Sequence, residues 1–274
     1  MEKMDLHTHS NKSDGTLSPR EVVAAAREAG VALLALTDHD CTLGVAEALE
    51  AGKALGIRVI PGMELDTEFP TELHMLGLHI DPANEELQAF MAENTRRRQA
   101  RNEAILQKLA EAGADVRPFL PRLSGNPTRL HVALALVQGG YAQSIGQAFQ
   151  AYLNRGMPGY VDTRRISPED AIGLIHRAGG LAVLAHPCKL KADVPALVAR
   201  LAGAGLDGIE AYYPAATPGQ RAEALALARQ HGLLVSCGSD FHGANRPDNA
   251  LGCAWAPDAA LEPIYERLAG SPGA

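Results

Sequence analysis

The sequence predicts an α/β barrel, in which a cylinder of parallel strands is surrounded by helices. One unit recurs along the 274-residue chain: Ser-Pro or Thr-Pro, an alanine-rich stretch with helical spacing, a glycine, and an apolar run. The apolar runs are continuous, as expected of parallel strands that are buried on both faces. Histidines and acids follow the ends of these runs, where the active sites of such barrels gather. An open doubly wound sheet is the alternative, but it concentrates its site at one switch point, whereas here nearly every strand contributes.

Each recurring unit opens with signals that start a helix and closes with signals that end it. In the first unit Ser18 can cap the helix, Glu21 completes a capping box and Gly30 ends the helix. The same order returns twice, so the three units span residues 18–40, 167–187 and 217–242. Further apolar runs at 4–10, 58–65, 73–80 and 207–213 bring the expected number of strands to about seven.

The alternation of helices and strands stops between residues 82 and 160. Segments 84–113, 129–140 and 144–156 have helical spacing, and each ends at a glycine. We therefore expect residues 1–81 and 161–274 to form a discontinuous barrel domain, and residues 82–160 to form a helical insertion that caps it. The basic run in the first segment is expected to be a solvated helix face: Arg96, Arg97, Arg98 and Arg101.

Composition and charge exclude several classes of protein. Hydrophobic residues make up 46% and charged residues 21% of the chain, which excludes wholesale disorder. The formal net charge of −7 argues against a broad electrostatic grip on long nucleic acid or on an anionic membrane. The sequence has no signal pattern, no membrane-spanning apolar stretch and no Cys-x-x-Cys spacing. We expect a cytoplasmic protein whose cysteines are small core residues: Cys41, Cys188, Cys237 and Cys253.

Near the start, "MDLHTHS" places two histidines two residues apart. Alternate side chains of a strand share a face, so His7 and His9 would converge, although an isolated pair is more often a polar edge strand. Further groups of the same chemistry follow at strand ends, and the whole set is His7, His9, Asp14, His39, Glu64, His74, His186, Asp240 and His242. Packing of the core does not explain why so many imidazoles and carboxylates stand at strand ends. They are also too many to bind a single ion. Imidazole and carboxylate ligands suit Mn, Fe or Zn, so we expect two or three divalent ions.

Several motifs together closely resemble the PHP superfamily, named for polymerase and histidinol phosphatase domains. These motifs are "DLHTHSNKSDG", "LTDHD", "PGMEL", "LHMLG", "LAHP" and "GSDFHG", and they follow the family's order over nearly the whole chain. The resemblance implies a distorted (β/α)7 barrel, a trinuclear metal site and phosphoester hydrolysis. Mn²⁺ is the expected metal, with Zn²⁺, Fe²⁺ and Mg²⁺ as alternatives.

The resemblance also implies a distribution of ligands among the ions. The first ion would be held by His7, His9, Glu64 and Asp240, the second by Glu64, His74 and His186, and the third by Asp14, His39 and His242. Many relatives carry His where Asp14 stands, which predicts weaker binding or a different ion at the third position. We expect hydroxide held between two ions to attack phosphorus in line. Metal-bound water and His242 are the candidate proton donors to the leaving oxygen.

The segments "TRLHVALALV", "AFQAYLNRGMPGYV" and "SPEDAIGLIHRAGG" narrow the resemblance to small bacterial PHP phosphoesterases that act on nucleotides. Members of that group remove the 3′-phosphate from nucleoside 3′,5′-bisphosphates such as phosphoadenosine phosphate, or trim short RNA from its 5′ end. The implied function is bisphosphate phosphatase, with 5′-to-3′ exonuclease on short RNA as the first alternative. A histidinol-phosphate phosphatase is the second. A catalytically silent PHP scaffold is disfavoured by the filled ligand positions, and an amidohydrolase by "TDHD" and "GSDFH".

Candidate substrate contacts lie apart from the ligand set. Arg129 and His131, in "TRLHVA", could grip a substrate phosphate, because an arginine fork fits phosphate oxygens bidentately. Lys189 is a weaker candidate for the same role, because a lysine at such a position is more often a solvated side chain without a ligand. Tyr213 could stack a base, although strand-end aromatics are more often packed. Asp5 is expected to orient a ligand histidine instead of binding metal itself.

Overall fold

The computed structural model describes residues 1–120 and 128–270. The chain divides into two compact units, of which the first comprises Met1–Ala89 with Arg165–Ala274 and the second Phe90–Arg164. The first unit contains all the strands of the described residues, and the second is helical.

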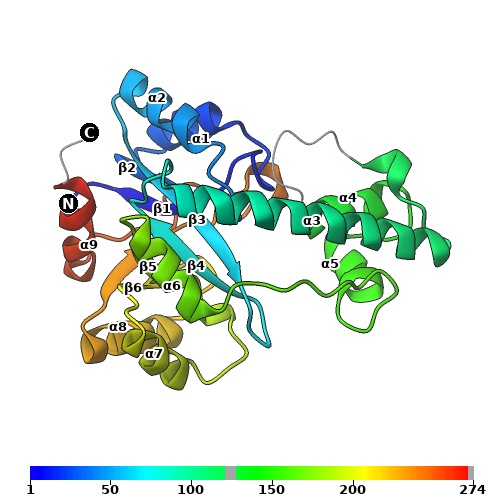
Figure 1. Ribbon diagram of the computed structural model, residues 1–274. Helices are drawn as coiled ribbons and strands as arrows, with labels where there is room; N and C mark the ends of the chain where they lie inside the picture. The colour runs from blue at the N-terminus through cyan, green and yellow to red at the C-terminus, as the bar shows by residue number, and fades with distance from the viewer. Residues whose placement is uncertain (121–127, 271–274) are drawn as a thin grey trace. The chain divides into compact units, whose positions relative to one another are not determined.

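The strands of the first unit form one sheet in which sequence order and spatial order agree (Figure 1). They are β1 (Met4–Thr8), β2 (Leu33–Leu36), β3 (Arg58–Thr67), β4 (Leu73–Leu78), β5 (Leu181–Leu184), β6 (Gly208–Tyr212) and β7 (Leu234–Cys237). The sheet is nearly closed into a barrel, because the segments after β1 and β7 meet. His9 N donates to Phe241 O at 2.9 Å, and Asp240 N donates to His7 O at 2.9 Å. The predicted seven-stranded α/β barrel is therefore confirmed.

The expectation of parallel strands throughout is wrong at one place. β4 runs antiparallel to both of its neighbours, β3 and β5, whereas the other pairs are parallel. Only residues 68–72 separate β3 from β4, and a parallel pair needs a crossover of a dozen residues or more. The short connection therefore forces a hairpin. As a result, the first residues of β4 lie at the same rim of the barrel as the last residues of the parallel strands.

Helices surround the barrel (Figure 1), and three of them begin where the repeated units predict. The first unit contains α1 (Pro19–Glu28), α2 (Val45–Leu55), α6 (Pro168–Arg177), α7 (Val194–Gly203), α8 (Pro218–His231) and α9 (Glu262–Ala269). The predicted caps are present: Ser18 and Thr217 form capping boxes, and Ser167 accepts a hydrogen bond from Asp170 N. Between the barrel and α1 and α2, a hydrophobic core includes Val22, Leu34 and Ala48.

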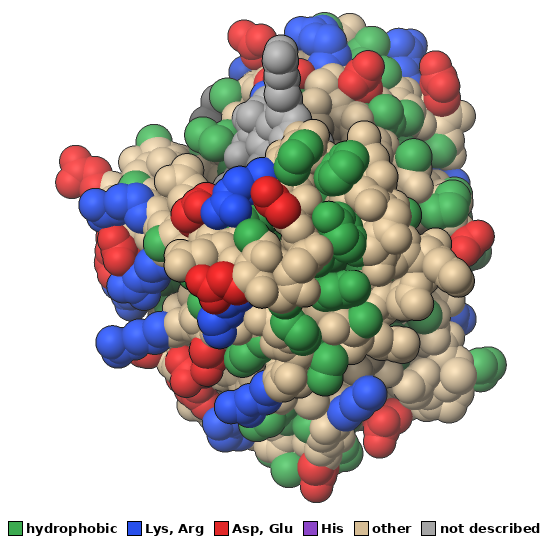
Figure 2. All heavy atoms as spheres, turned by 90° about the vertical axis from the view of Figure 1, so that its right-hand side faces the viewer, with side chains coloured by type: hydrophobic (Ala, Val, Ile, Leu, Met, Phe, Trp, Pro, Cys, Tyr) green, Lys and Arg blue, Asp and Glu red, His purple; other side chains and the backbone are tan. Residues whose placement is uncertain are grey.

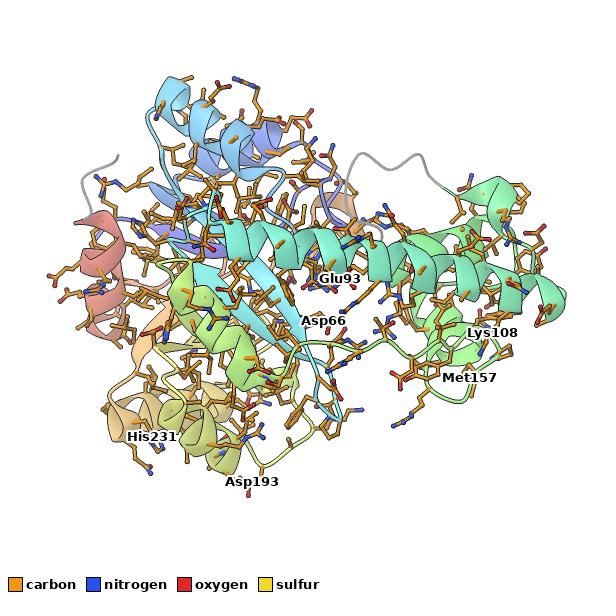
Figure 3. The ribbon with its side chains drawn as sticks, in the orientation of Figure 1. Asp66, Glu93, Lys108, Met157, Asp193 and His231 are labelled. Atoms are coloured by element: carbon orange, nitrogen blue, oxygen red, sulfur yellow. The ribbon has the colours of Figure 1, made fainter. Side chains whose placement is uncertain are left out.

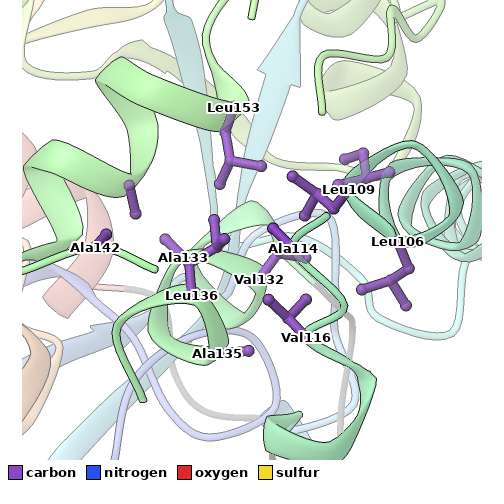
Figure 4. Close-up of a cluster of buried hydrophobic side chains, with 12 residues drawn as sticks. Leu106, Leu109, Ala114, Val116, Val132, Ala133, Ala135, Leu136, Ala142 and Leu153 are labelled. Carbon is purple, nitrogen blue, oxygen red and sulfur yellow. The ribbon is translucent and has the colours of Figure 1, made fainter. Parts of the chain in front are cut away.

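The second unit has its own core. It is built from most of α3 (Glu85–Glu111), α4 (Arg129–Gln138), α5 (Ile145–Ala148) and a π-helical turn at Phe149–Leu153. Leu109, Val132, Leu136 and Leu153 meet in this core (Figure 4) and are almost fully buried. An apolar cluster of this kind is sufficient to hold the helices of the unit together.

The surface carries no single-sign patch on the face drawn in Figure 2, where basic and acidic side chains are interspersed. Within the predicted solvated helix face, Arg96 and Arg97 both pair with Glu93, at 2.7 Å. Arg98 and Arg101 are instead buried, so the expectation of a fully solvated run is wrong for these two.

The cysteines follow the sequence prediction only in part. Cys41 and Cys237 are buried, but Cys188 is half-buried and Cys253 is exposed, so the last two are not core residues. Within the described part of the chain, no helix has the length and hydropathy that crossing a bilayer requires.

Candidate metal centre

All nine predicted ligand residues lie at one rim of the barrel, and each is less than a tenth exposed. They come from β1 and the loop after it, from the segments after β2, β5 and β7, from the middle of β3 and from the start of β4: His7, His9, Asp14, His39, Glu64, His74, His186, Asp240 and His242. His74 reaches the rim because β4 is reversed. His7, Glu64 and His74 lie within strands, whereas the other ligand residues follow a strand's C-terminal end.

Glu64 stands between two sets of imidazoles. Its Oε1 lies 2.8 Å from Nδ1 of His74 and 3.0 Å from Nε2 of His186. Its Oε2 lies 3.0 to 3.2 Å from Nε2 of His7, Nε2 of His9 and Nδ1 of His39. A carboxylate that presents one oxygen to each set is placed to bridge two ions.

Asp240 and Asp14 complete the centre on its other side. Asp240 Oδ1 lies 3.4 Å from His9 Nε2 and 3.7 Å from His7 Nε2. Asp14 Oδ1 lies 3.2 Å from His242 Nε2, and Asp14 Oδ2 lies 3.9 Å from His39 Nε2. The donor atoms form four overlapping groups: His9, Asp14, His39 and His242; His7, His9 and Asp240; His7, Glu64 and His186; and His39, Glu64 and His74.

The side chains fit divalent metal ions. Within the described residues, seven buried polar atoms of these side chains make no hydrogen bond: His7 Nε2, His9 Nδ1, His9 Nε2, Asp14 Oδ1, Glu64 Oε2, His186 Nδ1 and His242 Nε2. Each such orphan costs about 1–3 kcal/mol unless something satisfies it. Two ligands that are each ~2.0–2.2 Å from one ion stand about 3–3.5 Å apart, close to most of the separations seen here. Imidazole and carboxylate donors without thiolates suit Mn, Fe or Zn.

The centre is electrostatically coupled. Burial lowers the pKa of every ring, but carboxylates oppose this for some of them: Glu64, Glu210 and Asp240 raise the pKa of His7 well above its usual value. Despite burial, Asp240 and Glu64 raise the pKa of His9 to about 9. Burial prevails at His39, whose pKa falls to about 3.

The carboxylates of the centre respond in the opposite direction. Burial raises the pKa of a carboxyl group, but the His7, His39 and His74 rings hold the pKa of Glu64 well below its usual range. Neighbouring imidazoles do the same for Asp14 and, with Arg246, for Asp240. The three carboxylates are therefore ionised at neutral pH and ready to act as metal ligands.

Two rings have their tautomers fixed by acceptors outside the centre. His7 Nδ1 lies 3.1 Å from Glu210 Oε1, and His242 Nδ1 lies 2.8 Å from Asp240 O. A carboxylate or carbonyl oxygen accepts, so each Nδ1 carries a proton, and Nε2 is the atom that a metal ion would bind once the ring is neutral. For His242, this arrangement favours the predicted ligand role over the predicted proton donation.

A model described as the PHP domain matches residues 5–213, the segment that carries seven of the nine residues. The chain belongs to the PHP domain family. Two relatives of this PHP chain have names that describe an activity. One is the "5'-3' exoribonuclease Rnm" of Salmonella typhimurium, 40% identical over 87% of this chain and 84% of that protein. The other is the "3',5'-nucleoside bisphosphate phosphatase" of Chromobacterium violaceum, 36% identical over 98% of this chain and 97% of that protein.

The PHP fold is also present among solved structures. A protein from Chromobacterium violaceum, described as an amidohydrolase with bound sulfate and no metal, matches with a TM-score of 0.89. It is 36% identical, and the match covers 98% of this chain and 96% of that one. Family membership, the names of the relatives and the buried cluster make this chain a metal-dependent phosphoesterase. Which ester it cleaves is a separate question.

The sequence prediction missed two residues that contact the PHP centre. Glu210 lies inside β6 and binds both the His7 ring and, through Oε2, the His186 amide at 2.6 Å. A lone acid within a buried apolar strand was the available signal. Arg246, in a loop after β7 with no motif of its own, pairs with Asp240.

Asp5 differs from its predicted role. It accepts backbone hydrogen bonds from Ser239 N at 2.9 Å and Gly252 N at 2.7 Å, with a longer one of 3.4 Å from His7 N. Asp5 therefore ties β1 to the segments after β7 and does not orient a ligand ring, which Glu210 does for His7. The predicted orienting role of Asp5 is thus wrong, because its carboxylate points along the backbone of the barrel seam.

A further ion pair stands beside His74. Asp66 on β3 (labelled in Figure 3) accepts from Arg165 Nε at 2.9 Å, and its other oxygen lies 3.8 Å from His74 Nε2. Asp66 thus places a negative charge beside His74, and this charge helps to raise the pKa of that ring.

The backbone is strained at two ligand positions. His186 has φ 29° and Asp240 has φ 54°, in the left-handed region that side chains other than glycine rarely adopt. His186 lies two residues after β5, and Asp240 lies three residues after β7. Strain of this kind persists only where the surroundings over-determine it, and it clusters at functional sites.

The predicted substrate contacts lie in the second unit. His131 Nδ1 accepts from Thr128 N at 3.0 Å, at the start of α4, and the Arg129 guanidinium lies 5.6 Å from the centroid of the Phe149 ring. Both contacts are compatible with structural roles at the helix start, and the substrate roles of these residues stay predictions. The Tyr213 ring is buried, and its hydroxyl donates to Asp240 Oδ2 at 2.8 Å, so packing accounts for this residue better than base stacking.

Proposed function

We propose that this PHP chain hydrolyses the 3′-phosphate of nucleoside 3′,5′-bisphosphates, releasing a nucleoside 5′-monophosphate and inorganic phosphate. The observation that carries the proposal is the match to the bisphosphate phosphatase, which extends over 98% of this chain and 97% of that protein. The net charge of −7 agrees with a small substrate better than with a long nucleic acid.

The residues of the centre would divide the work between holding ions and excluding water. The nine buried side chains would hold the divalent ions, with Glu64 between two of them. When bound, such ions polarise the phosphoryl group and activate water. The ligand side chains have almost no exposure, so they would hold the ions away from bulk water.

A 5′-to-3′ exonuclease on short RNA is the second candidate. The observation that favours it is the 40% identity to the exoribonuclease, which exceeds the 36% identity to the phosphatase. Both reactions cleave a phosphate ester of a ribonucleotide by the same metal chemistry. They differ in whether the ester is a terminal phosphomonoester or a phosphodiester that carries the rest of an RNA chain.

The deciding experiment measures product release from a panel of substrates, with Mn²⁺, Mg²⁺ or Zn²⁺ added to metal-free protein. The panel contains adenosine 3′,5′-bisphosphate, 3′-AMP, 5′-AMP, histidinol phosphate and a short 5′-phosphorylated RNA. The proposal expects the highest kcat/KM for the bisphosphate, with AMP and phosphate as products. Faster release of mononucleotides from RNA would replace it by the second candidate, and a preference for histidinol phosphate would overturn both.

A matched pair of variants separates this activity from a contaminant. Glu64→Ala removes the carboxylate that contacts five imidazoles, and should lower kcat for the bisphosphate by about 10³-fold or more. Glu47→Ala, on the outer helix α2, removes the same charge from a residue that accepts a hydrogen bond from the Arg20 amide and is no predicted ligand, so it should leave kcat unchanged. Equal activity in the two preparations would show that the measured hydrolysis comes from another protein.

A further inference from the structure

Three donors converge on one oxygen of Asp240. Lys189 Nζ lies 3.0 Å from Asp240 Oδ2, the Tyr213 hydroxyl lies 2.8 Å from it, and Arg246 also pairs with it. Lys189 ends the short 3₁₀ turn Pro187–Lys189 that follows His186, and its ammonium group lies 4.7 Å from the centroid of the Tyr213 ring. Two segments of the barrel rim therefore aim a cation at the same carboxylate.

This carboxylate cannot neutralise both cations. Asp240 carries one negative charge and shares it with the centre through Oδ1, which lies 3.4 Å from His9 Nε2. Lys189 and Arg246 each carry one positive charge, so these three side chains together carry one net positive charge beside the metal ligands. The Asp240 side chain is 2% exposed, whereas those of Lys189 and Arg246 are 39% and 38% exposed. The excess charge therefore faces the solvent at the rim.

The position of the two cations defines the anion that they can reach. Asp240 presents Oδ1 to the imidazoles and Oδ2 to the cations, so the cations stand one carboxylate group away from the metal-ligand atoms. A phosphoryl group bound at the centre would extend over a similar distance. The guanidinium offers a fork of donors to phosphate oxygens, and the ammonium group offers a mobile point charge.

We propose that Lys189 and Arg246 bind the non-bridging oxygens of the phosphoryl group that is transferred to water. The inference rests on the proposed phosphoesterase function. It adds the residues that bind the negatively charged phosphoryl group of the substrate. In the cleavage, water forms a bond to phosphorus, the bond from phosphorus to the ester oxygen breaks, and that oxygen takes a proton. Charge on the phosphoryl oxygens is held throughout by the two cations, which would give up part of their contact with Asp240.

The test uses the metal-loaded protein and inorganic phosphate as the probe. Lys189→Met and Arg246→Met should each weaken phosphate binding, measured by calorimetry, by about 10- to 100-fold. The same variants should bind Mn²⁺ as tightly as the wild type or more tightly, because each removes a positive charge near the ions. Lys191→Met is the matched control, since Lys191 is exposed two residues beyond Lys189, and it should change neither affinity.

The signs of the two effects distinguish substrate contact from support of Asp240. A cation that only positions Asp240 would, when removed, weaken binding of Mn²⁺ and phosphate together, and this result would overturn the proposal. Wild-type phosphate affinity in both variants would overturn it as well. Lys189→Arg retains the charge and should retain phosphate binding to within a few-fold, so a loss as large as in Lys189→Met would also count against it.

The outcome is independent of which ester the enzyme prefers. If the wild-type protein fails to cleave adenosine 3′,5′-bisphosphate, the proposed function fails while the phosphate and Mn²⁺ titrations still decide the role of the cations. If the protein cleaves the bisphosphate but both variants bind phosphate normally, the proposed function stands and this inference fails.

Discussion

His7 Nδ1 donates a hydrogen bond to Glu210 Oε1 over 3.1 Å, and the other oxygen of Glu210 accepts from the backbone amide of His186 at 2.6 Å. One buried carboxylate on β6 thus fixes a ring from β1 and the turn after β5. Outer partners of this kind hold the tautomer and direction of a ligand histidine.

Glu210→Gln should weaken metal binding. The amide oxygen can still accept from one partner, but its NH2 group would then face another N–H donor, so one of the two contacts is lost. We expect the affinity for Mn²⁺ to fall by about 10- to 100-fold, measured by competition with a chelator. Glu223→Gln, an exposed substitution on α8 with the same change of charge, is the control. An unchanged affinity in Glu210→Gln would rule out the orienting role.

Gly238→Ala should disturb the contact between His7 and Glu210, because Gly238 packs against both residues. A Cβ at this position would overlap Cβ of His7 and Oε1 of Glu210. Overpacking of this kind costs about 1–3 kcal/mol in the free energy of unfolding, and it should also weaken Mn²⁺ binding. Gly219→Ala, at the start of α8, meets open space and should be neutral or slightly stabilising. The prediction fails if the two variants have the same denaturation midpoint.

Metal affinity should fall as the pH is lowered. In the metal-free protein, burial lowers the pKa of His9 and His74, but nearby carboxylates outweigh it and raise each pKa to about 9. Both rings are then protonated at pH 7, whereas a metal ion binds only the neutral ring. Binding must therefore release protons, and the affinity should drop about tenfold per pH unit for each protonated ring. Calorimetry at pH 7 in two buffers of different ionisation enthalpy measures this release, and identical heats in both buffers would contradict it.

Arg129→Ala should raise KM for a bisphosphate by about tenfold or more, if Arg129 binds a phosphate of the substrate through a charge-assisted hydrogen bond. Arg129→Lys keeps the charge but loses the fork, so it should recover only part of the affinity. Arg155→Ala, an exposed substitution in the same unit, should leave KM unchanged. If Arg129→Ala lowers thermal stability while KM stays constant, the role of Arg129 is structural and the substrate contact is ruled out.

The parts of the fold that local chemistry determines could be predicted from the sequence. Ser18, Ser167 and Thr217 start helices at the predicted positions, because a side-chain oxygen followed by proline is a strong local signal. The reversal of β4 was missed because its residues are as apolar as those of a parallel strand. The length of the connection at 68–72 was the informative feature, and it acts through chain geometry instead of residue type.

The candidate centre divides in the same way. Each of the nine predicted residues stands in a short motif, and the structure brings all nine together. Glu210 and Arg246 lack a motif, since their roles depend on contacts with segments more than 20 residues away for Glu210 and on a loop conformation for Arg246. Asp5 was assigned the wrong partner because the amides of Ser239 and Gly252 meet it only after the barrel closes.

The seam between β1 and the segment after β7 has a consequence for how the enzyme is made. His7 and His9 leave the ribosome well before Asp240 and His242, which stand far later in the sequence. A complete centre therefore cannot exist on a nascent chain until the last strand has been made and the two ends have met. Tight metal binding is then a property of the finished barrel. A truncated product that lacks β7 and the segment after it would fail to retain metal.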